Sequence, residues 1–157
     1  MIAVEQLVTH WKAQGLPLAS GASEAEISSF ESRYQLVLPR DLRSYFGSVN
    51  GLVQRGGVDT DREGFAFWPL ERVQPVPKVC AQFQVAVPSV RDPELYFVFA
   101  DYLQWSWAYA IHLRTSDNSV IVVGADAGVV ANSFTQFVAL YVQDAETLYP
   151  ARRKPAL

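Results

Sequence analysis

The sequence has few of the residues on which enzyme and metal chemistry depend. Its 157 residues include one cysteine, Cys80, and two histidines, His10 and His112. A single cysteine excludes an intrachain disulfide and a cysteine metal cluster. The histidines lie in different predicted elements, and neither accompanies a nucleophile signature such as G-x-S-x-G. We therefore interpret both histidines as structural or exposed, and Cys80 as a small buried apolar side chain.

The chain also lacks an excess of positive charge. Its 13 basic and 16 acidic side chains give a net charge of −3. Nucleic-acid binding requires a basic stripe that neutralises phosphates, and the only cationic run, Arg152-Arg153-Lys154, is typical of a solvated tail. Direct binding of nucleic acid is therefore disfavoured.

Long hydrophobic runs are missing as well. No stretch approaches the roughly 20 consecutive apolar residues of a membrane-spanning helix. The first residues, MIAVEQLVTHWKAQ, carry Glu5 and other polar side chains within their apolar pattern, unlike the core of a signal peptide. We expect no membrane segment and a cytoplasmic location, with which a single cysteine is compatible.

The residues that are present favour one folded domain over residues 1–157. Half of the side chains are hydrophobic and 18% are charged, which argues against intrinsic disorder. The length is that of one ordinary domain.

Four short apolar runs between residues 95 and 134 predict the central sheet. They are rich in Val, Ile, Tyr, Phe and Trp, which favour strands. Short polar or glycine-containing segments separate them, as in antiparallel pairs with tight connections. The runs, which predict a meander of three or four strands, are Leu95–Ala100, Ser106–Leu113, Ser119–Val123 and Gly128–Ala131.

Apolar residues at helical spacing predict two or three helices before the meander and one after it. The stripes fall at residues 4–11, 27–34, 42–49 and 134–141. Ser23 with Glu26, and Ser133 with Gln136, have capping-box spacing. Pro39 opens the third helix, and Asn50-Gly51 ends it. The sequence therefore predicts an α+β domain with helices packed on a mostly antiparallel sheet.

Two shorter segments complete this picture. Residues 65–68 predict a short strand, and residues 70–73 a single helical turn. Residues 78–90 are ambiguous, because apolar residues alternate as in a strand while prolines at 77, 88 and 93 bracket a possible surface excursion.

The acidic segment of residues 59–64 resembles the opening of a calcium loop. Such a loop needs a bidentate acid at its twelfth position, where this chain has Leu70. An acidic solvated loop, or part of a partner-binding surface, is the favoured interpretation. The segment Gly124–Gly128 lacks both phosphate-binding fingerprints and is interpreted as a turn.

Trp105 and Trp107 are two residues apart, so both are expected on one side of a strand. Core packing is the default for such a pair, and an exposed member would be an interface hot spot. We predict a non-catalytic binding protein without metal or cofactor. Its candidate surface is an exposed aromatic cluster with an acidic rim, which would steer a cationic partner site. The candidate partner-binding residues are Asp59, Asp61, Glu63, Asp101 and Trp105.

Several segments recur in an order that resembles the SUKH superfamily, in its branch similar to fungal cell-wall assembly regulators. The segments are EAEISSFESRY, LVLPRDLRSYFGSVNGL, FAFWPLERV, YFVFADYLQWSWAYAIHL and VIVVGADAGVVANSFTQFVALY. The resemblance covers about residues 23–142. Its most specific residues are Ile27, Phe30, Glu31, Leu38-Pro39, Asn50-Gly51, Ser133, Phe134 and Phe137.

The resemblance implies a curved, largely antiparallel sheet with helices against it, no enzymatic activity and no cofactor. It also implies an immunity protein that binds and blocks a cognate bacterial toxin. A regulatory or scaffold domain in a larger intracellular assembly is the alternative. A third class, a small-molecule-binding domain or enzyme, predicts a deep pocket with convergent polar groups. The chain departs from the glycine-rich acidic turn of many relatives, because it has Ala100-Asp101-Tyr102-Leu103-Gln104 there.

Overall fold

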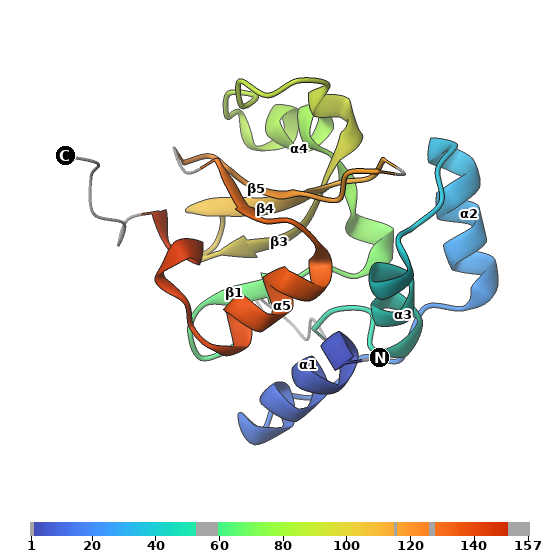
Figure 1. Ribbon diagram of the computed structural model, residues 1–157, viewed down its shortest axis with the longest axis vertical. Coiled ribbons are helices and arrows are strands. Elements are labelled where there is room, and N and C mark those ends of the chain that lie inside the picture. The colour runs from blue at the N-terminus through green and yellow to red at the C-terminus, as the bar shows by residue number, and fades with distance from the viewer. Residues whose placement is uncertain (1, 53–59, 115, 126–127, 151–157) are drawn as a thin grey trace.

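The fold, seen in a computed structural model, is built around an antiparallel sheet (Figure 1). The structure describes residues 2–52, 60–114, 116–125 and 128–150. Within these ranges the sheet has six strands in the order β1-β3-β4-β5-β6, and β2 pairs with β3 beside β1. The strands are β1 (Phe65–Phe67), β2 (Gln74–Pro75), β3 (Tyr96–Tyr102), β4 (Trp107–His112), β5 (Val120–Val123) and β6 (Val129–Ala131).

The four apolar runs of the meander correspond to β3, β4, β5 and β6, which confirms the predicted antiparallel order. Every residue of β3, β4 and β5 is buried. A strand is buried on both sides only when both faces of its sheet are covered. This explains why apolar residues follow one another in these strands instead of alternating with polar ones, with Asp101 and His112 as buried polar exceptions.

Helices cover the two faces unequally. Figure 1 shows α4 on one face of the sheet and α1 and α5 on the other. Aromatic contacts fix the second layer, because Phe99 of β3 packs against Phe134 and Phe137 of α5. The helices are α1 (Ile2–Ala13), α2 (Glu24–Tyr34), α3 (Arg40–Ser48), α4 (Val76–Phe83) and α5 (Phe134–Val142). The three helices before the sheet and the one after the meander confirm the α+β prediction.

The predicted helix boundaries rest on capping chemistry. The amide of Glu26 donates to Ser23 Oγ at 3.1 Å, and Glu26 Oε1 accepts from the Ser23 amide at 3.4 Å, which completes the capping box. At α5 the Ser133 hydroxyl accepts from the Gln136 amide at 3.0 Å. Gln136 Oε1 instead accepts from the Asn132 amide, so the second box is only half formed.

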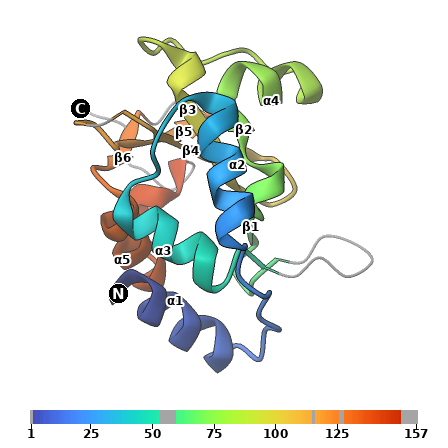
Figure 2. The ribbon, with the colours of Figure 1, turned by 90° about the vertical axis from the view of Figure 1, so that its right-hand side faces the viewer.

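Two of the N-terminal helices are held together by ion pairs. Figure 2 shows α2 and α3 side by side. Arg43 of α3 pairs with Glu24 at 2.5 Å and with Glu31 at 2.6 Å, both on α2. Glu31 also accepts a hydrogen bond from the Leu38 amide at 2.7 Å, so it orders the linker between the two helices.

The ambiguous segment contains a helix, so its strand-like alternation was misleading. In α4 the buried residues Val76, Val79 and Cys80 follow helical spacing. Pro77 lies in the first turn, where a missing N–H does not break the helix. By contrast, Phe83 and Val87 of the apparent alternation are 39% and 43% exposed. The alternating residues therefore share no buried face. The helix contacts β3.

The remaining short elements agree with expectation. A strand at Phe65–Phe67 and a 3-10 turn at Leu70–Arg72 occupy the predicted places. Asn50 and Gly51 take positive φ angles of 44° and 80° after α3, as the end of a helix requires. In the part of the chain that is described, no helix is both long and apolar enough to span a bilayer.

Candidate functional site

The connection between β3 and β4 has an unusual backbone. Leu103, Gln104 and Trp105 have φ angles of 47°, 53° and 68°. Left-handed geometry costs an L-residue roughly 1–2 kcal/mol, and outside glycine it occurs mostly at single residues. Strained backbone of this kind persists only where the surroundings enforce it, and it concentrates at functional sites.

Hydrogen bonds fasten the turn to its neighbours on both sides. The Leu103 amide donates to the carbonyl oxygen of Gly64, and the Ser106 amide to that of Tyr102, each at 2.9 Å. The Ser106 hydroxyl donates to the Leu103 carbonyl oxygen at 3.1 Å. These bonds join the turn to the residue before β1 and to the ends of β3 and β4.

Asp101, at the end of β3, provides a further anchor. It is 5% exposed, and its Oδ1 accepts from the Trp105 amide at 3.2 Å. Its Oδ2 accepts from Trp68 Nε1 at 2.7 Å. The guanidinium of Arg72 lies 3.9 Å above the Trp68 ring. Burial lowers the pKa of Arg72, and the charge of Asp101 raises it in part.

The turn carries two large apolar side chains, Leu103 and Trp105, and Trp105 packs against α4. The Trp105 ring stacks on Phe83 with a centroid distance of 4.4 Å and an interplanar angle of 14°. It also stacks on Trp68 at 6.0 Å and 26°. Leu103 is 53% exposed and Phe83 39% exposed, while Trp105 is half-buried. We call Phe83, Leu103 and Trp105 the aromatic turn surface.

A second turn, at residues 61–64, supports the first. Asp61 Oδ1 accepts from the amides of Glu63, Gly64 and Phe65 at 2.9, 2.8 and 2.9 Å. Gly64 has a φ of 102°, and a Cβ there would lie 2.6 Å from Leu103 Cδ2. The glycine therefore permits the close approach of the two turns.

Asp61 also ties this turn to the helices. Its Oδ2 accepts from the hydroxyl of Tyr141 on α5. That hydroxyl accepts in turn from Trp11 Nε1 on α1, at 2.8 Å. The chain of hydrogen bonds joins the N-terminal helix, the C-terminal helix and the base of the aromatic turn surface.

With this geometry in place, the chain was compared with known proteins. The sequence model of the SMI1 / KNR4 family (SUKH-1) matches residues 21–140, which include both turns and α4. The chain belongs to this family. The comparison with curated proteins gives no match.

In this SUKH-1 chain the candidate acidic residues do not form the expected exposed rim. Asp61 and Asp101 are each 5% exposed, so our expectation that they face solvent is wrong. The reason is that the carboxylate oxygens accept hydrogen bonds inside the fold. Asp61 accepts from backbone amides and the Tyr141 hydroxyl, and Asp101 accepts from a backbone amide and the Trp68 indole. Glu63 is exposed, and Asp59 lies outside the described residues. A contact of these residues with a partner stays a prediction.

The two tryptophans also separate. Trp107 lies in β4, is 8% exposed and stacks on Tyr102 at 4.6 Å. Trp105 precedes the strand, so the expectation that both share one strand face is wrong. Leu103 and Phe83 were not among the candidates. The only sequence signal for Leu103 was its place where the resemblance implies a glycine-rich turn, and Phe83 lay in the ambiguous segment.

Both oxygens of Asp61 accept hydrogen bonds from amide or hydroxyl groups, so the donors around this carboxylate are N–H and O–H groups. Among the residues that the structure describes, no group of three or more His, Cys, Asp or Glu side chains has the arrangement of a metal site. Cys80 is 1% exposed, and burial raises the pKa of its thiol.

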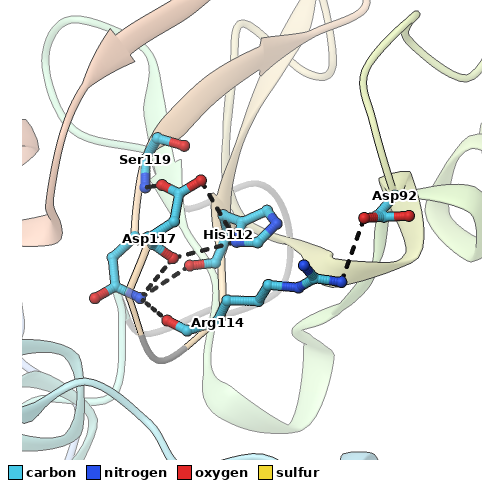
Figure 3. Close-up of polar contacts among 6 residues, drawn as sticks. Asp92, His112, Arg114, Asp117 and Ser119 are labelled. Atoms are coloured by element: carbon cyan, nitrogen blue, oxygen red, sulfur yellow. Dashed lines mark hydrogen bonds and ion pairs between the residues drawn. The ribbon is translucent and has the colours of Figure 1, made fainter.

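His112 is packed into the fold at the end of β4. His112 is 5% exposed, its Nδ1 lies 3.2 Å from the carbonyl oxygen of Asp117, and its ring meets the edge of Tyr96. Figure 3 shows this cluster at the β4–β5 connection. The Ser119 amide donates to Asp117 Oδ1 at 3.0 Å, and this hydrogen bond lowers the pKa of Asp117.

A groove lies at the opposite ends of β3 and β4 from the aromatic turn surface. It has a volume of about 1040 Å³, and its walls include the α2–α3 linker together with Leu113, Arg114, Ser116 and Asn118. Val37 on this groove is 81% exposed. Because it lies far along the strands from Trp105, Val37 provides a control position for the experiments below.

Replacement of Gln104 by glycine is expected to raise the free energy of unfolding by about 0.5–1 kcal/mol. Glycine removes the penalty for the left-handed backbone, and its greater freedom in the unfolded chain offsets part of this gain. Urea denaturation measures the difference. The control is Gln82→Gly in α4, where the residue is also exposed but helical, and where glycine should destabilise by about 1 kcal/mol. A loss of stability in both variants would contradict the role of strain at Gln104.

Alkaline pH is expected to unfold the protein from about pH 10 upward. Burial is the main reason that the pKa values of Tyr45, Tyr141 and Tyr149 are raised above the ordinary 10.0. Their contribution is complete below pH 10 and is lost as pH rises toward the folded-state pKa values. In that pH window each tyrosine should lower the free energy of unfolding by about 1.4 kcal/mol per pH unit. Urea denaturation between pH 9 and 11.5 should give a shallower slope for Tyr141→Phe, and an identical slope would contradict this cause.

Proposed function

We propose that the protein is a non-catalytic binding domain that covers a partner protein with the aromatic turn surface. The observation that carries the proposal is the left-handed backbone of three consecutive residues, none of which is glycine. Glycines would give the same backbone at lower cost. The chain instead keeps Leu103 and Trp105 there and leaves much of Leu103 in solvent. A backbone conformation that the local residue types disfavour is typical of a functional site.

The energetics of protein interfaces support this use of the surface. Tryptophan is the residue type most enriched among interface hot spots, which lie at the centre of a contact and are surrounded by near-neutral residues. The Trp105 ring stacks on that of Phe83, and Leu103 lies two residues before Trp105 in the same turn. The side chains of Phe83 and Leu103 are both exposed. A turn that is ordered before binding avoids the entropic cost of ordering it in the complex. A specific interface of standard size, about 800 Å² per partner, would extend beyond these three residues.

We further propose that the partner is a cognate bacterial toxin, and that the protein is an immunity protein acting by stoichiometric occlusion. Membership of the SUKH-1 family supports this assignment. The buried positions of Asp61 and Asp101 shift the expected basis of recognition from acidic steering to apolar contact. A regulatory or scaffold role differs in one consequence, because its partner would not be toxic when expressed alone.

Co-expression with the product of the adjacent reading frame tests the assignment. We expect that product to arrest growth when expressed alone, and the immunity protein to restore growth. The two proteins should also co-purify at equal stoichiometry. A harmless product that co-purifies would favour the regulatory or scaffold role. A toxic product that neither binds nor is neutralised would contradict the immunity assignment.

A further inference from the structure

On the basis of the proposed function, we infer that Asp101 is a positioning residue for partner binding. Its buried carboxylate holds the 103–105 turn in the left-handed conformation in the free protein, so that Leu103 and Trp105 are presented before the partner arrives. Asp101 itself would not touch the partner, because it is 5% exposed and lies beneath the turn.

The two carboxylate oxygens act on two parts of the aromatic stack. Oδ1 accepts from the backbone amide of Trp105, which fixes the end of the left-handed turn. Oδ2 accepts from Nε1 of Trp68, whose ring stacks on that of Trp105. One side chain thus fixes both the backbone of Trp105 and the ring against which its indole packs.

The chemistry of the site requires a carboxylate at this position. Both donors are N–H groups, so the side chain must offer two acceptors in two directions. An asparagine of the same shape has one oxygen and one NH₂ group, and its NH₂ group would face one of the two N–H donors. The guanidinium of Arg72 above Trp68 places a positive charge near the carboxylate, and the charge of Asp101 raises the pKa of Arg72 in part.

The left-handed backbone makes the turn dependent on its anchors. Leu103, Gln104 and Trp105 would each prefer a right-handed or extended conformation, so the turn is expected to relax once an anchor is removed. Relaxation would move Trp105 off Phe83 and Trp68. Binding would then require the turn to be reordered, which lowers affinity mainly through a slower association step.

The test uses the 157-residue chain and five variants: Asp101→Asn, Gln104→Gly, the combination of these two, Trp68→Phe and Trp105→Ala. Hydrogen exchange of the Trp105 amide and the Trp68 indole N–H is followed by NMR in the free protein. Affinity and association rate for the co-purifying partner are measured under conditions in which all variants are folded. Trp68→Phe removes the indole donor and keeps a smaller aromatic ring at the buried position. It serves as the second test if Asp101→Asn does not fold.

We expect Asp101→Asn to accelerate exchange at both N–H groups and to weaken affinity by roughly 10- to 100-fold, the effect of losing one or two charge-assisted hydrogen bonds. Gln104→Gly in the Asp101→Asn background should recover part of this loss, since glycine reduces the strain that the carboxylate opposes. A residue that only stabilised the fold would give no such rescue. In Trp68→Phe the Trp105 amide should also exchange faster.

Unchanged exchange of the Trp105 amide in Asp101→Asn would overturn the inference without any reference to a partner. Faster exchange with wild-type affinity would overturn the positioning role. The variant Trp105→Ala tests the proposed function independently of Asp101. Wild-type affinity of that variant would exclude the aromatic turn surface itself. Lost affinity in Trp105→Ala with unchanged affinity in Asp101→Asn would exclude only the role of Asp101.

Discussion

Replacement of Trp105 by alanine is expected to weaken partner binding by about 30-fold or more. Truncation of a central tryptophan hot spot costs about 2 kcal/mol or more, and every 1.4 kcal/mol corresponds to tenfold in affinity. The indole is half-buried between Phe83 and Trp68, so the variant should also lose about 1–2 kcal/mol of stability and remain folded. Isothermal titration calorimetry with the purified partner measures the change in Kd.

The matched control for this variant is Val37→Ala. Val37 is 81% exposed and apolar, and it lies on the groove at the opposite ends of β3 and β4. Its truncation should change Kd by less than about twofold, because surface substitutions outside an interface have little effect. Equal affinities of Trp105→Ala and the wild type, or a larger effect at Val37, would place the interface elsewhere.

Replacement of Asp61 by alanine is expected to lower the free energy of unfolding by about 3–5 kcal/mol. The variant leaves the amides of Glu63, Gly64 and Phe65 and the hydroxyl of Tyr141 without their acceptor in a buried region. Each orphaned buried donor costs about 1–3 kcal/mol, and local relaxation recovers part of the sum. Since small domains are stable by only about 5–15 kcal/mol, a large fraction of the total is at risk.

The exposed neighbour Glu63 gives the control for Asp61. Glu63→Ala should change stability by less than about 0.5 kcal/mol, and Asp61→Asn should fall between the two, because its oxygen still accepts part of the set. Chemical denaturation followed by tryptophan fluorescence measures all three. A loss below about 1 kcal/mol in Asp61→Ala would contradict the role of the carboxylate as the common acceptor of the turn and α5.

Much of the fold was predictable because its signals are local. The run Ser119–Val123 became β5 with one residue of difference, and Ser23 with Glu26 fixed the start of α2. Periodicity failed at α4, where Ala81, Phe83, Val85 and Val87 alternate by composition although the helix buries Val76, Val79 and Cys80. The helix is only eight residues long, and the prolines in and after it favoured a surface excursion over a helix.

The site was predictable only in part because its key contacts are long-range. Asp61 accepts from Tyr141, 80 residues away, and Asp101 accepts from Trp68, 33 residues away. From the sequence alone, both acids are expected in an exposed rim, since carboxylates are seldom buried without partners. A left-handed run without glycine also has no sequence signature. The resemblance to a family with a glycine-rich turn at this place was the nearest indication.

Hydrogen–deuterium exchange of the protein alone and in its complex with the co-purifying partner tests the central claim most directly. We predict new protection of the amides around residues 81–84 and 103–106 in an equimolar complex, with little change in the α2–α3 linker. Protection confined to residues 34–39 and 113–118, with unchanged exchange at the 103–106 turn, would contradict binding through the aromatic turn surface.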